Sequence, residues 1–253
     1  MLEVSKVSKS YTSGFWRNRK TYAVQNISFQ IKDGEIFGLI GESGSGKTTT
    51  SRIIMGFLKP DQGSVLYKGR DLAQLNKRQW AEIRREIQMI FQHPQMTFNP
   101  RFTVYDCCAE PIRRFHLAKD REQERAMVLA VLDSVGVPRD QLQKFPHEIS
   151  GGQAQRISIA RTLQLNPRLL ICDEPTSMLD VSVQAQIISL LREQQRQSGF
   201  SILYISHNLD VVRAVCQRVA VMQGGEIVEM GAVNEIYQSP QHPYTKQLLD
   251  SVI

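Results

Sequence analysis

The segment at residues 41–48, GESGSGKT, restricts the fold of this 253-residue chain more than any other feature. It matches the pattern G-x-x-x-x-G-K-[ST], follows the apolar run EIFGLI, and precedes TTTSRIIMGFL, whose apolar spacing predicts a helix. In such a loop the glycines let backbone N–H groups turn toward a phosphate, the lysine adds a point charge, and the last hydroxyl binds Mg²⁺. A chance glycine loop would lack this strand and helix, so we expect a phosphate-binding site in an α/β protein.

Four apolar runs are continuous rather than alternating, which is typical of strands buried on both faces of a parallel sheet. Ligands in open α/β sheets bind beyond the carboxyl ends of the strands, so we expect the polar groups that follow these runs to meet at one edge. The runs are EIFGLI (35–40), IQMIF (87–91), RLLIC (168–172) and SILYI (201–205). The groups that follow them are the phosphate loop, Gln92, Asp173 with Glu174, and Ser206 with His207.

Two segments predict antiparallel structure outside this sheet. Apolar residues alternate in NISFQIK (26–32), and the dipeptide DG that follows predicts a hairpin turn. Residues 60–63, in KPDQGSVLYKGRDL, predict a second turn with glycine last, as type I turns prefer.

Helical patterns dominate the chain between Gln92 and Asn166, and predict a helical region inserted into the sheet. A further helix is expected at Val181–Ser198, ending at Gly199, because glycine is common just past a helix terminus. The clearest inserted pattern is REQERAMVLAVLDSVGV, with apolar positions at Met127, Leu129, Val131 and Leu132.

Asp173 and Glu174 form an acidic pair at the end of RLLICDE. A carboxylate at position 173 can hold Mg²⁺ on the side opposite the phosphate loop, directly or through water. The next carboxylate, Glu174, can orient or deprotonate the water that attacks a γ-phosphate. An exposed strand-end acid is the simpler alternative, but it does not explain the pairing beside a phosphate loop.

Three further side chains are candidates because of their positions. His207 could contact the γ-phosphate or position the attacking water, although a lone histidine is often structural. Gln92 could be an ordinary surface amide, or could reach metal or water. An aromatic ring at Tyr11 could stack on adenine, with nearby competitors at Phe15, Trp16 and Tyr22.

A second glycine-rich turn, ISGGQ, begins a helix that stops before Pro167. Ser150 and Gln153 have the spacing of a capping box, and Gly151 with Gly152 leave the first turn open to close approach. In an ordinary capped helix each glycine would cost about 1 kcal/mol relative to alanine. We therefore interpret this turn as a second ligand surface.

Composition limits the cellular setting. Cys107, Cys108, Cys172 and Cys216 show no metal-ligand spacing and suit reduced thiols in the cytosol. The net charge of +6 is modest and mixed in sign, despite a basic cluster of Arg17, Arg19 and Lys20, so no nucleic-acid partner is expected. No run is long enough to cross a membrane, and the start MLEVSKVSKSY lacks the apolar segment of a signal peptide, so any membrane role is expected to depend on a partner.

The order of GESGSGKT, Gln92, ISGGQ, LLICDE, SMLD and His207 resembles the nucleotide-binding subunits of ABC transporters over nearly the whole chain. The resemblance implies a P-loop NTPase with a RecA-like core and a mostly parallel sheet, at residues 1–91 and 166–235. That core would carry an antiparallel β-subdomain. An inserted α-helical subdomain at 92–165 and a C-terminal tail at 236–253 would complete one ATPase domain.

The resemblance also implies the roles of individual residues toward ATP and Mg²⁺. Catalytic groups would be Glu174, His207, Lys47 and Gln92, and metal ligands would be Thr48, Gln92 and Asp173. Two subunits of that family enclose two ATP molecules head to tail, so the ISGGQ turn would act on a partner's ATP. Nucleotide contacts would come from Tyr11, Gly41, Glu42, Ser43, Gly44, Ser45, Gly46, Lys47, Thr48, Thr49, Gln92 and Asp173, and across the dimer from Ser150, Gly151, Gly152, Gln153 and Asp180.

More narrowly, FQHPQMTFNPRFTV, LDVSVQAQIISLL and QSPQHPYTKQLL resemble the ATPases of peptide and nickel importers. This implies a homodimer, or a heterodimer with a related ATPase, bound peripherally to two integral membrane permease subunits at the cytoplasmic face of the inner membrane. A substrate-binding protein outside the membrane would act indirectly, and the cargo would be a peptide, nickel or a metal chelate. Some members carry a C-terminal extension with a cysteine cluster, which is absent up to Ile253, so no iron–sulfur site is expected.

Two departures and two rival functions accompany this resemblance. Ile149 replaces the usual leucine before SGGQ, and Met178 stands where alanine is common, but neither change removes a catalytic group. A soluble ABC-type ATPase acting on ribosomes or DNA would usually carry duplicated cassettes or long linkers. A metabolite kinase would use the phosphate loop without ISGGQ or the acidic pair.

Overall fold

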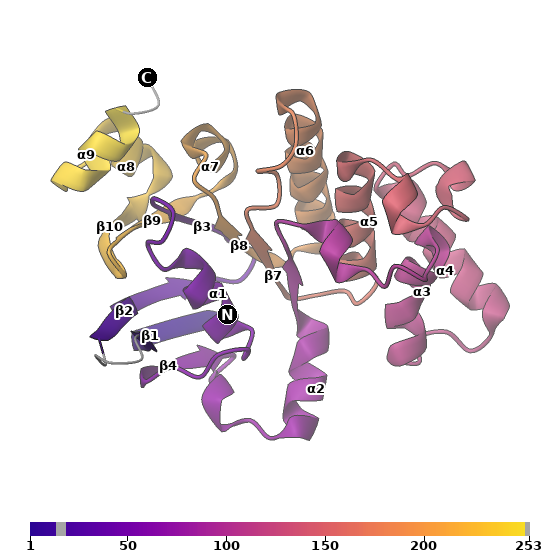
Figure 1. Ribbon diagram of the computed structural model, residues 1–253, viewed down its shortest axis with the longest axis horizontal. Helices are drawn as coiled ribbons and strands as arrows, with labels where there is room; N and C mark the ends of the chain where they lie inside the picture. Colours follow the sequence, from indigo (N-terminus) through magenta and orange to yellow (C-terminus); the bar gives the residue numbers. More distant parts are fainter. Residues whose placement is uncertain (14–18, 251–253) are drawn as a thin grey trace.

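The computed structural model describes residues 1–13 and 19–250, and within them the chain forms two β-sheets surrounded by helices (Figure 1). The strands are β1 (Leu2–Ser13), β2 (Arg19–Ile31), β3 (Ile36–Ile40), β4 (Gln62–Tyr67), β5 (Arg70–Asp71), β6 (Ile87–Ile90), β7 (Leu169–Asp173), β8 (Ser201–Ile205), β9 (Arg218–Gln223) and β10 (Glu226–Ala232). The helices are α1 (Lys47–Ile54), α2 (Lys77–Glu86), α3 (Val104–Arg114), α4 (Arg121–Ser134), α5 (Gly151–Leu163), α6 (Val181–Ser198), α7 (Leu209–Val215), α8 (Val233–Gln238) and α9 (Pro243–Asp250).

The larger sheet has the strand order β10-β9-β3-β8-β7-β6. All four continuous apolar runs lie in it as neighbouring parallel strands, so the prediction of a buried parallel sheet is confirmed. Strand β9 extends the parallel part and β10 adds an antiparallel edge, and neither strand was predicted from the sequence. The α/β fold class is likewise confirmed.

Both faces of this sheet are covered by apolar side chains. In β8, Ile202 and Tyr204 pack into the cluster shared with α3 to α9, while Leu203 and Ile205 pack into the cluster shared with α1 and the smaller sheet. Successive strand residues point to opposite faces, so a strand covered on both sides must be apolar throughout. Each of these four side chains is at most 1% exposed, which explains why the run is continuous.

The smaller sheet is antiparallel and has the order β2-β1-β4-β5. The predicted strand at 26–32 lies in β2, but the hairpin predicted after it is wrong. Its DG turn carries the chain into β3 of the other sheet, because β2 pairs with β1 and β3 is buried between β8 and β9.

The turn predicted at residues 60–63 is displaced. Gln62 and Gly63 belong to β4, and the tight turn of the β4–β5 hairpin is at Lys68 and Gly69. Gly63 has φ of 82°, and a Cβ there would lie 2.4 Å from the carbonyl oxygen of Lys6. This glycine therefore serves a close approach to β1 rather than a chain reversal.

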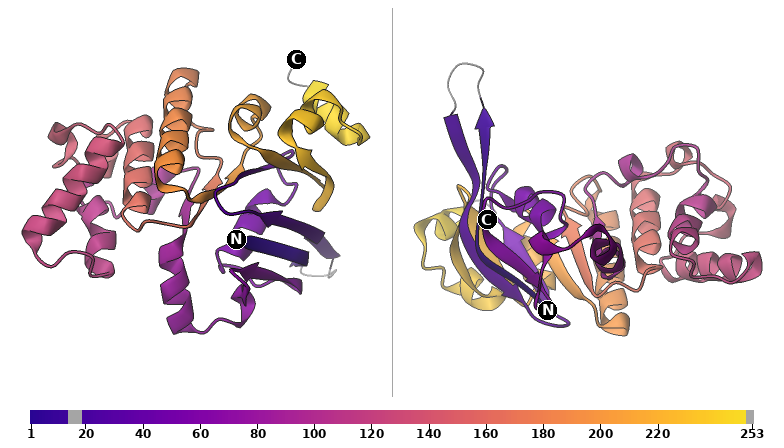
Figure 2. Two further views of the ribbon diagram at one scale, coloured as in Figure 1. Left: turned by 180° about the vertical axis from the view of Figure 1, so that it is seen from behind. Right: turned by 90° about the horizontal axis from the view of Figure 1, so that it is seen from below.

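Helices α3, α4 and α5 lie between β6 and β7 in the chain and stand together at one end of the molecule (Figures 1 and 2). On α4 the deepest apolar positions are Val128 and Leu132. The helix predicted at Val181–Ser198 is α6, and it ends at Gly199 with φ of 69°, as expected. Across residues 1–13 and 19–250, none of the helices is both long and apolar enough to span a membrane.

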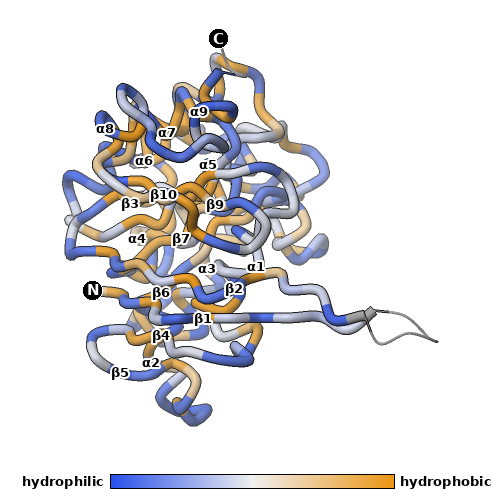
Figure 3. Tube along the Cα trace, turned by 90° about the vertical axis from the view of Figure 1, so that its left-hand side faces the viewer, coloured by the Kyte–Doolittle hydropathy of each residue, from blue (hydrophilic) through white to orange (hydrophobic). Residues whose placement is uncertain are grey.

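The β1–β2 hairpin projects from the opposite end, and its described part is mostly polar (Figures 2 and 3). Helix α1 lies between the two sheets, where Ile53 and Ile54 join the apolar cluster that both sheets share. The amino end of α1 thereby faces the carboxyl edge of the larger sheet, where β3 delivers the phosphate loop.

Candidate active site

The phosphate loop connects β3 directly to α1, as predicted. Lys47, the first residue of α1, is 5% exposed, and its Nζ donates hydrogen bonds to the carbonyl oxygens of Gly41 and Glu42, each at 2.8 Å. Burial lowers the pKa of Lys47, while the negative charges of Glu174 and Asp173 act in the opposite direction. The acidic neighbours thus favour the charged form of the buried lysine, and that positive charge suits an anionic ligand.

Two glycines let neighbouring backbone pack against this loop. Gly41 has φ of 146°, and a Cβ on it would lie 2.1 Å from the carbonyl oxygen of Met222 in β9. Gly46 has φ of 107°, and its Cβ would lie 2.3 Å from the carbonyl oxygen of Ala23 in β2. The loop is therefore enclosed by both sheets, and no other residue type fits either position without backbone movement.

Asp173 ends β7 beside α1, where it is 7% exposed. Its Oδ2 accepts a hydrogen bond from Ser51 Oγ at 3.2 Å. Burial is the largest influence on its pKa and raises it above the ordinary value, against the effect of the Ser51 hydrogen bond. Ser51 was not among the predicted site residues, although its position one turn after Lys47 and Thr48 on a helix was a usable signal.

The residues here fit a Mg²⁺ ion. Asp173 Oδ1 is buried and accepts no hydrogen bond within the described part of the chain, which is unusual for a carboxylate oxygen. The side chain of Thr48 reaches Asp173 and supplies a hydroxyl oxygen. Carboxylate and hydroxyl oxygens are the hard ligands that Mg²⁺ takes together with phosphate oxygens.

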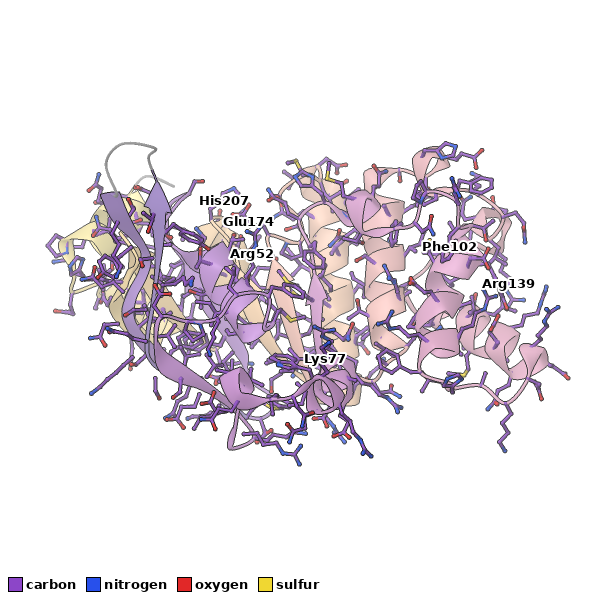
Figure 4. All side chains as sticks on the ribbon, turned by 60° about the horizontal axis from the view of Figure 1, so that its bottom comes forward. Arg52, Lys77, Phe102, Arg139, Glu174 and His207 are labelled. Carbon is purple, nitrogen blue, oxygen red and sulfur yellow. The ribbon has the colours of Figure 1, made fainter. Side chains whose placement is uncertain are left out.

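Glu174 lies between two of the other predicted catalytic side chains, His207 and Gln92. Its Oε1 is 3.2 Å from His207 Nδ1, and its Oε2 accepts a hydrogen bond from Gln92 Nε2 at 3.3 Å. Figure 4 shows Glu174 and His207 side by side at the edge of the sheet. The backbone of Glu174 has φ of 49°, a region that costs a non-glycine residue on the order of 1–3 kcal/mol and recurs at functional sites.

The second glycine-rich turn opens α5 as expected. Ser150 Oγ accepts from the N–H of Gln153 at 3.3 Å, and the Gln153 side chain accepts from the N–H of Ser150 at 3.2 Å, which completes the capping box. Figures 1 and 2 place α5 on the far side of β8, β7 and α6 from α1. The two turns therefore do not converge on one ligand within this chain.

Gly151 and Gly152 differ in their surroundings. A Cβ at Gly152 would lie 2.7 Å from Cγ1 of Val183 at the start of α6, so this glycine is explained by packing within the chain. A Cβ at Gly151 would meet only Leu179 Cδ2, at an ordinary 3.6 Å, and the residue is exposed. Packing within the chain therefore does not explain the glycine at position 151, which leaves an external ligand as its explanation.

Asp180 and Tyr11 lie outside this cluster. The Asp180 side chain caps α6 by accepting from the N–H of Val183 at 2.9 Å, and is exposed. Tyr11 is 43% exposed in β1 opposite Thr21, whereas Tyr22 lies opposite Ser10, so the two rings stand on opposite faces of the hairpin. The competitors Phe15 and Trp16 and the basic Arg17 lie outside the described residues.

Comparisons of sequence and of structure with known proteins agree on one family. A family model described as ABC transporter matches residues 24–177. The oligopeptide transport ATP-binding protein OppF of Salmonella typhimurium is 46% identical over 239 residues, covering 94% of this chain and 72% of that protein. OppF of Streptococcus mutans is 42% identical over 252 residues, covering 100% and 81%. The dimeric ATP-binding cassette MJ0796, in a post-hydrolysis state bound to ADP and Pi, superimposes with a TM-score of 0.83 at 29% identity, covering 92% of this chain and 99% of that one.

Proposed function

Because the chain belongs to the ABC transporter family, we propose that it is the ATP-hydrolysing subunit that drives a membrane importer for peptides. It is an ABC-type ATPase homologous to oligopeptide transport ATP-binding proteins, and that homology favours transport over action on ribosomes or nucleic acid. The relatives reported above are oligopeptide transport proteins, so we propose peptides rather than nickel or metal chelates, the other cargoes that the sequence left open.

The observation that carries the proposal is the position of Glu174 between Gln92 and His207, beside Asp173 and the phosphate loop. Glu174 orients the attacking water and accepts its proton, and His207 holds the carboxylate in place. Lys47 and the N–H groups of the loop bind the phosphates of ATP. Bound Mg²⁺, held by Thr48 and Asp173, would neutralise charge on the phosphate oxygens.

The exposed turn at Ser150 and Gly151 acts on an ATP held by another subunit. Its position away from α1 leaves it with no ligand of its own, and N–H groups at a helix N-terminus favour an anion. Two subunits related by a two-fold axis would each complete the other's site. Asp180, exposed at the start of α6, would contact the partner in the same interface.

A groove of about 430 Å³ offers a docking place for a permease segment. It is lined by residues of β6, α3 and α5 and by the segment that follows α1, where Phe57 is 52% exposed. Phe91, which also lines the groove, immediately precedes Gln92, so movement of a docked segment would reach the Gln92–Glu174 hydrogen bond through one residue. The subunit would use this groove to bind one of two permeases at the cytoplasmic face of the membrane.

Reconstitution in proteoliposomes tests this function. The chain, assembled with its permeases and binding protein, should accumulate labelled peptide only when ATP and Mg²⁺ are supplied, and should release ADP and phosphate. A matched assembly carrying Glu174→Gln serves as the control for hydrolysis. Peptide accumulation without ATP, or ATP-dependent uptake of nickel but not peptide, would contradict the proposal.

A further inference from the structure

The C-terminal tail reaches the phosphate loop through one tyrosine. Glu42, the second residue of the loop, donates its backbone N–H to the hydroxyl oxygen of Tyr244 at 3.1 Å, across 202 positions of sequence. Tyr244 lies in the first turn of α9 and is 6% exposed. This tyrosine belongs to QSPQHPYTKQLL, the segment for which the site described above has no role.

Tyr244 and Lys47 both form hydrogen bonds with one peptide group, which joins Gly41 to Glu42. The group between Gly41 and Glu42 presents its N–H to Tyr244 and its C=O to Lys47 Nζ, at 2.8 Å. Met222 in β9 closes the remaining side, leaving no room for a Cβ at Gly41. The rotation of this peptide group is therefore fixed by contacts from three parts of the chain.

Hydrogen bonds and apolar packing fix the position of Tyr244 in the tail. The carboxylate of Glu229, in β10, accepts the N–H groups of Gln241 at 2.8 Å and His242 at 3.1 Å, just before α9 begins. His242 Nδ1 in turn accepts the N–H of Tyr244 at 3.2 Å. The Tyr244 ring packs in the apolar cluster that Ile236 of α8 also joins, so its hydroxyl has a set position.

We propose that Tyr244 is a positioning residue for ATP binding, which keeps the Gly41–Glu42 peptide in the orientation that the phosphate loop needs. The inference rests on the proposed ATPase function. A loop held in its binding conformation before the ligand arrives loses less conformational entropy on binding. Losing the hydroxyl would leave the Glu42 N–H without its partner and let the peptide rotate, which would also disturb the acceptor of Lys47. The tail thus contributes to nucleotide affinity without touching nucleotide.

Tyr244→Phe tests the proposal, and Tyr237→Phe is its matched control. Tyr237 lies in α8, and its hydroxyl donates to the carbonyl oxygen of Leu209 at 2.6 Å, at the start of α7 rather than in the phosphate loop. In the assembled transporter, Tyr244→Phe should weaken ADP and ATP binding alike, by about 3- to 10-fold, and raise the KM for ATP in proportion with kcat nearly unchanged. Tyr237→Phe should leave both dissociation constants at the parent values.

Exchange of the Glu42 amide hydrogen separates this inference from the function on which it rests. It should be faster in Tyr244→Phe than in the parent and in Tyr237→Phe, with no nucleotide present. If the parent bound no nucleotide while Glu42 exchange still responded, the proposed function would fail and the contact would stand. Unchanged Glu42 exchange and unchanged ADP affinity in Tyr244→Phe would overturn the inference, as would equal losses of affinity in both variants.

Discussion

The carboxylate of Glu174 lies 3.2 Å from the imidazole Nδ1 of His207. Glu174 follows β7 and His207 follows β8, two neighbouring parallel strands that end at the same edge. Gln92 reaches the other carboxylate oxygen from the end of β6, on the far side of β7. Three adjacent strands therefore set the position of the Glu174 carboxylate. Displacement of the end of β6, the edge strand, would move this carboxylate through Gln92.

Replacing Glu174 with glutamine should separate binding from hydrolysis. The substitution keeps the size of the side chain but removes the base, so turnover should fall by about 10²- to 10⁴-fold. ATP should still bind, and the ATP-bound subunits should remain paired, as measured by phosphate release and sedimentation. Glu193→Gln, on the exposed face of α6, is the control and should behave like the parent. Parent-like hydrolysis by Glu174→Gln would refute its assignment.

His207→Ala should lower turnover without unfolding the protein. The His207 side chain is 59% exposed, so the free energy of unfolding should change by no more than about 0.5 kcal/mol. Glu174 would lose the partner of one oxygen, and we expect kcat to fall by on the order of 10²-fold with unchanged ATP affinity. The comparison variant His116→Ala, at an exposed position just after α3, should retain full activity. Equal activities of the two variants would leave His207 without a role.

The two glycines of the ISGGQ turn should respond differently to substitution. Aspartate at Gly151 has room and suits a helix N-terminus, so Gly151→Asp should keep its thermal stability and bind ATP, but lose hydrolysis because its charge repels a phosphate. Valine at Gly152 would collide with Val183, and should lower the free energy of unfolding by about 1–3 kcal/mol. Thermal unfolding and phosphate release distinguish the two. An active Gly151→Asp variant would exclude the turn from the site.

The convergence of the candidate site residues could be predicted because continuous apolar runs mark buried parallel strands, whose carboxyl ends meet at one edge. Gln92, Asp173, Glu174 and His207 each follow such a run, so their convergence required no side-chain geometry. The phosphate loop and the capping box were predictable for a similar reason, since each is a local pattern with local hydrogen bonds.

Contacts between distant segments were harder to predict. Helical spacing from Lys47 places Ser51 near the site, but no pattern pairs it with Asp173, 122 positions away. Nor does any pattern pair Glu42 with Tyr244, 202 positions away. Strand β1 escaped prediction because irregularities between Val4 and Ser10 disrupt its pairing register and hence its alternation. Strand β10 is only half-buried and presents no clear pattern.

The four buried thiols should make the protein less stable in alkali. Burial raises the pKa of Cys107 to about 11 and raises the pKa values of Cys108, Cys172 and Cys216 further. An unfolded thiol titrates near pH 8.5, so this stabilisation is complete below about pH 8.5 and is lost as the pH rises toward the folded values. Lys47, whose pKa burial lowers, acts in the opposite direction but is a single group.

Chemical denaturation at a series of pH values measures this effect. The free energy of unfolding should decline between about pH 9 and 11, with each thiol contributing up to about 1.4 kcal/mol per pH unit. A variant with alanine at Cys108, Cys172 and Cys216 should be less stable at neutral pH but should decline more gently. If the free energy of unfolding declined with the same slope in parent and variant, groups other than these thiols would cause the loss of stability in alkali.

We expect the phosphate loop and the ISGGQ turn of one chain to serve different ATP molecules. Mixing two inactive variants, Lys47→Met and Gly151→Asp, tests this expectation. In a mixed dimer one site would combine both defects, while the other would pair an intact phosphate loop with an intact turn. Phosphate release in an equal mixture should recover to about one quarter of the parent rate, since half the dimers would hold one working site of two. The parent's rate per subunit must rise with concentration, as the control that the chain pairs with itself. Given that control, a mixture as inactive as its components would show that both turns act on the same ATP.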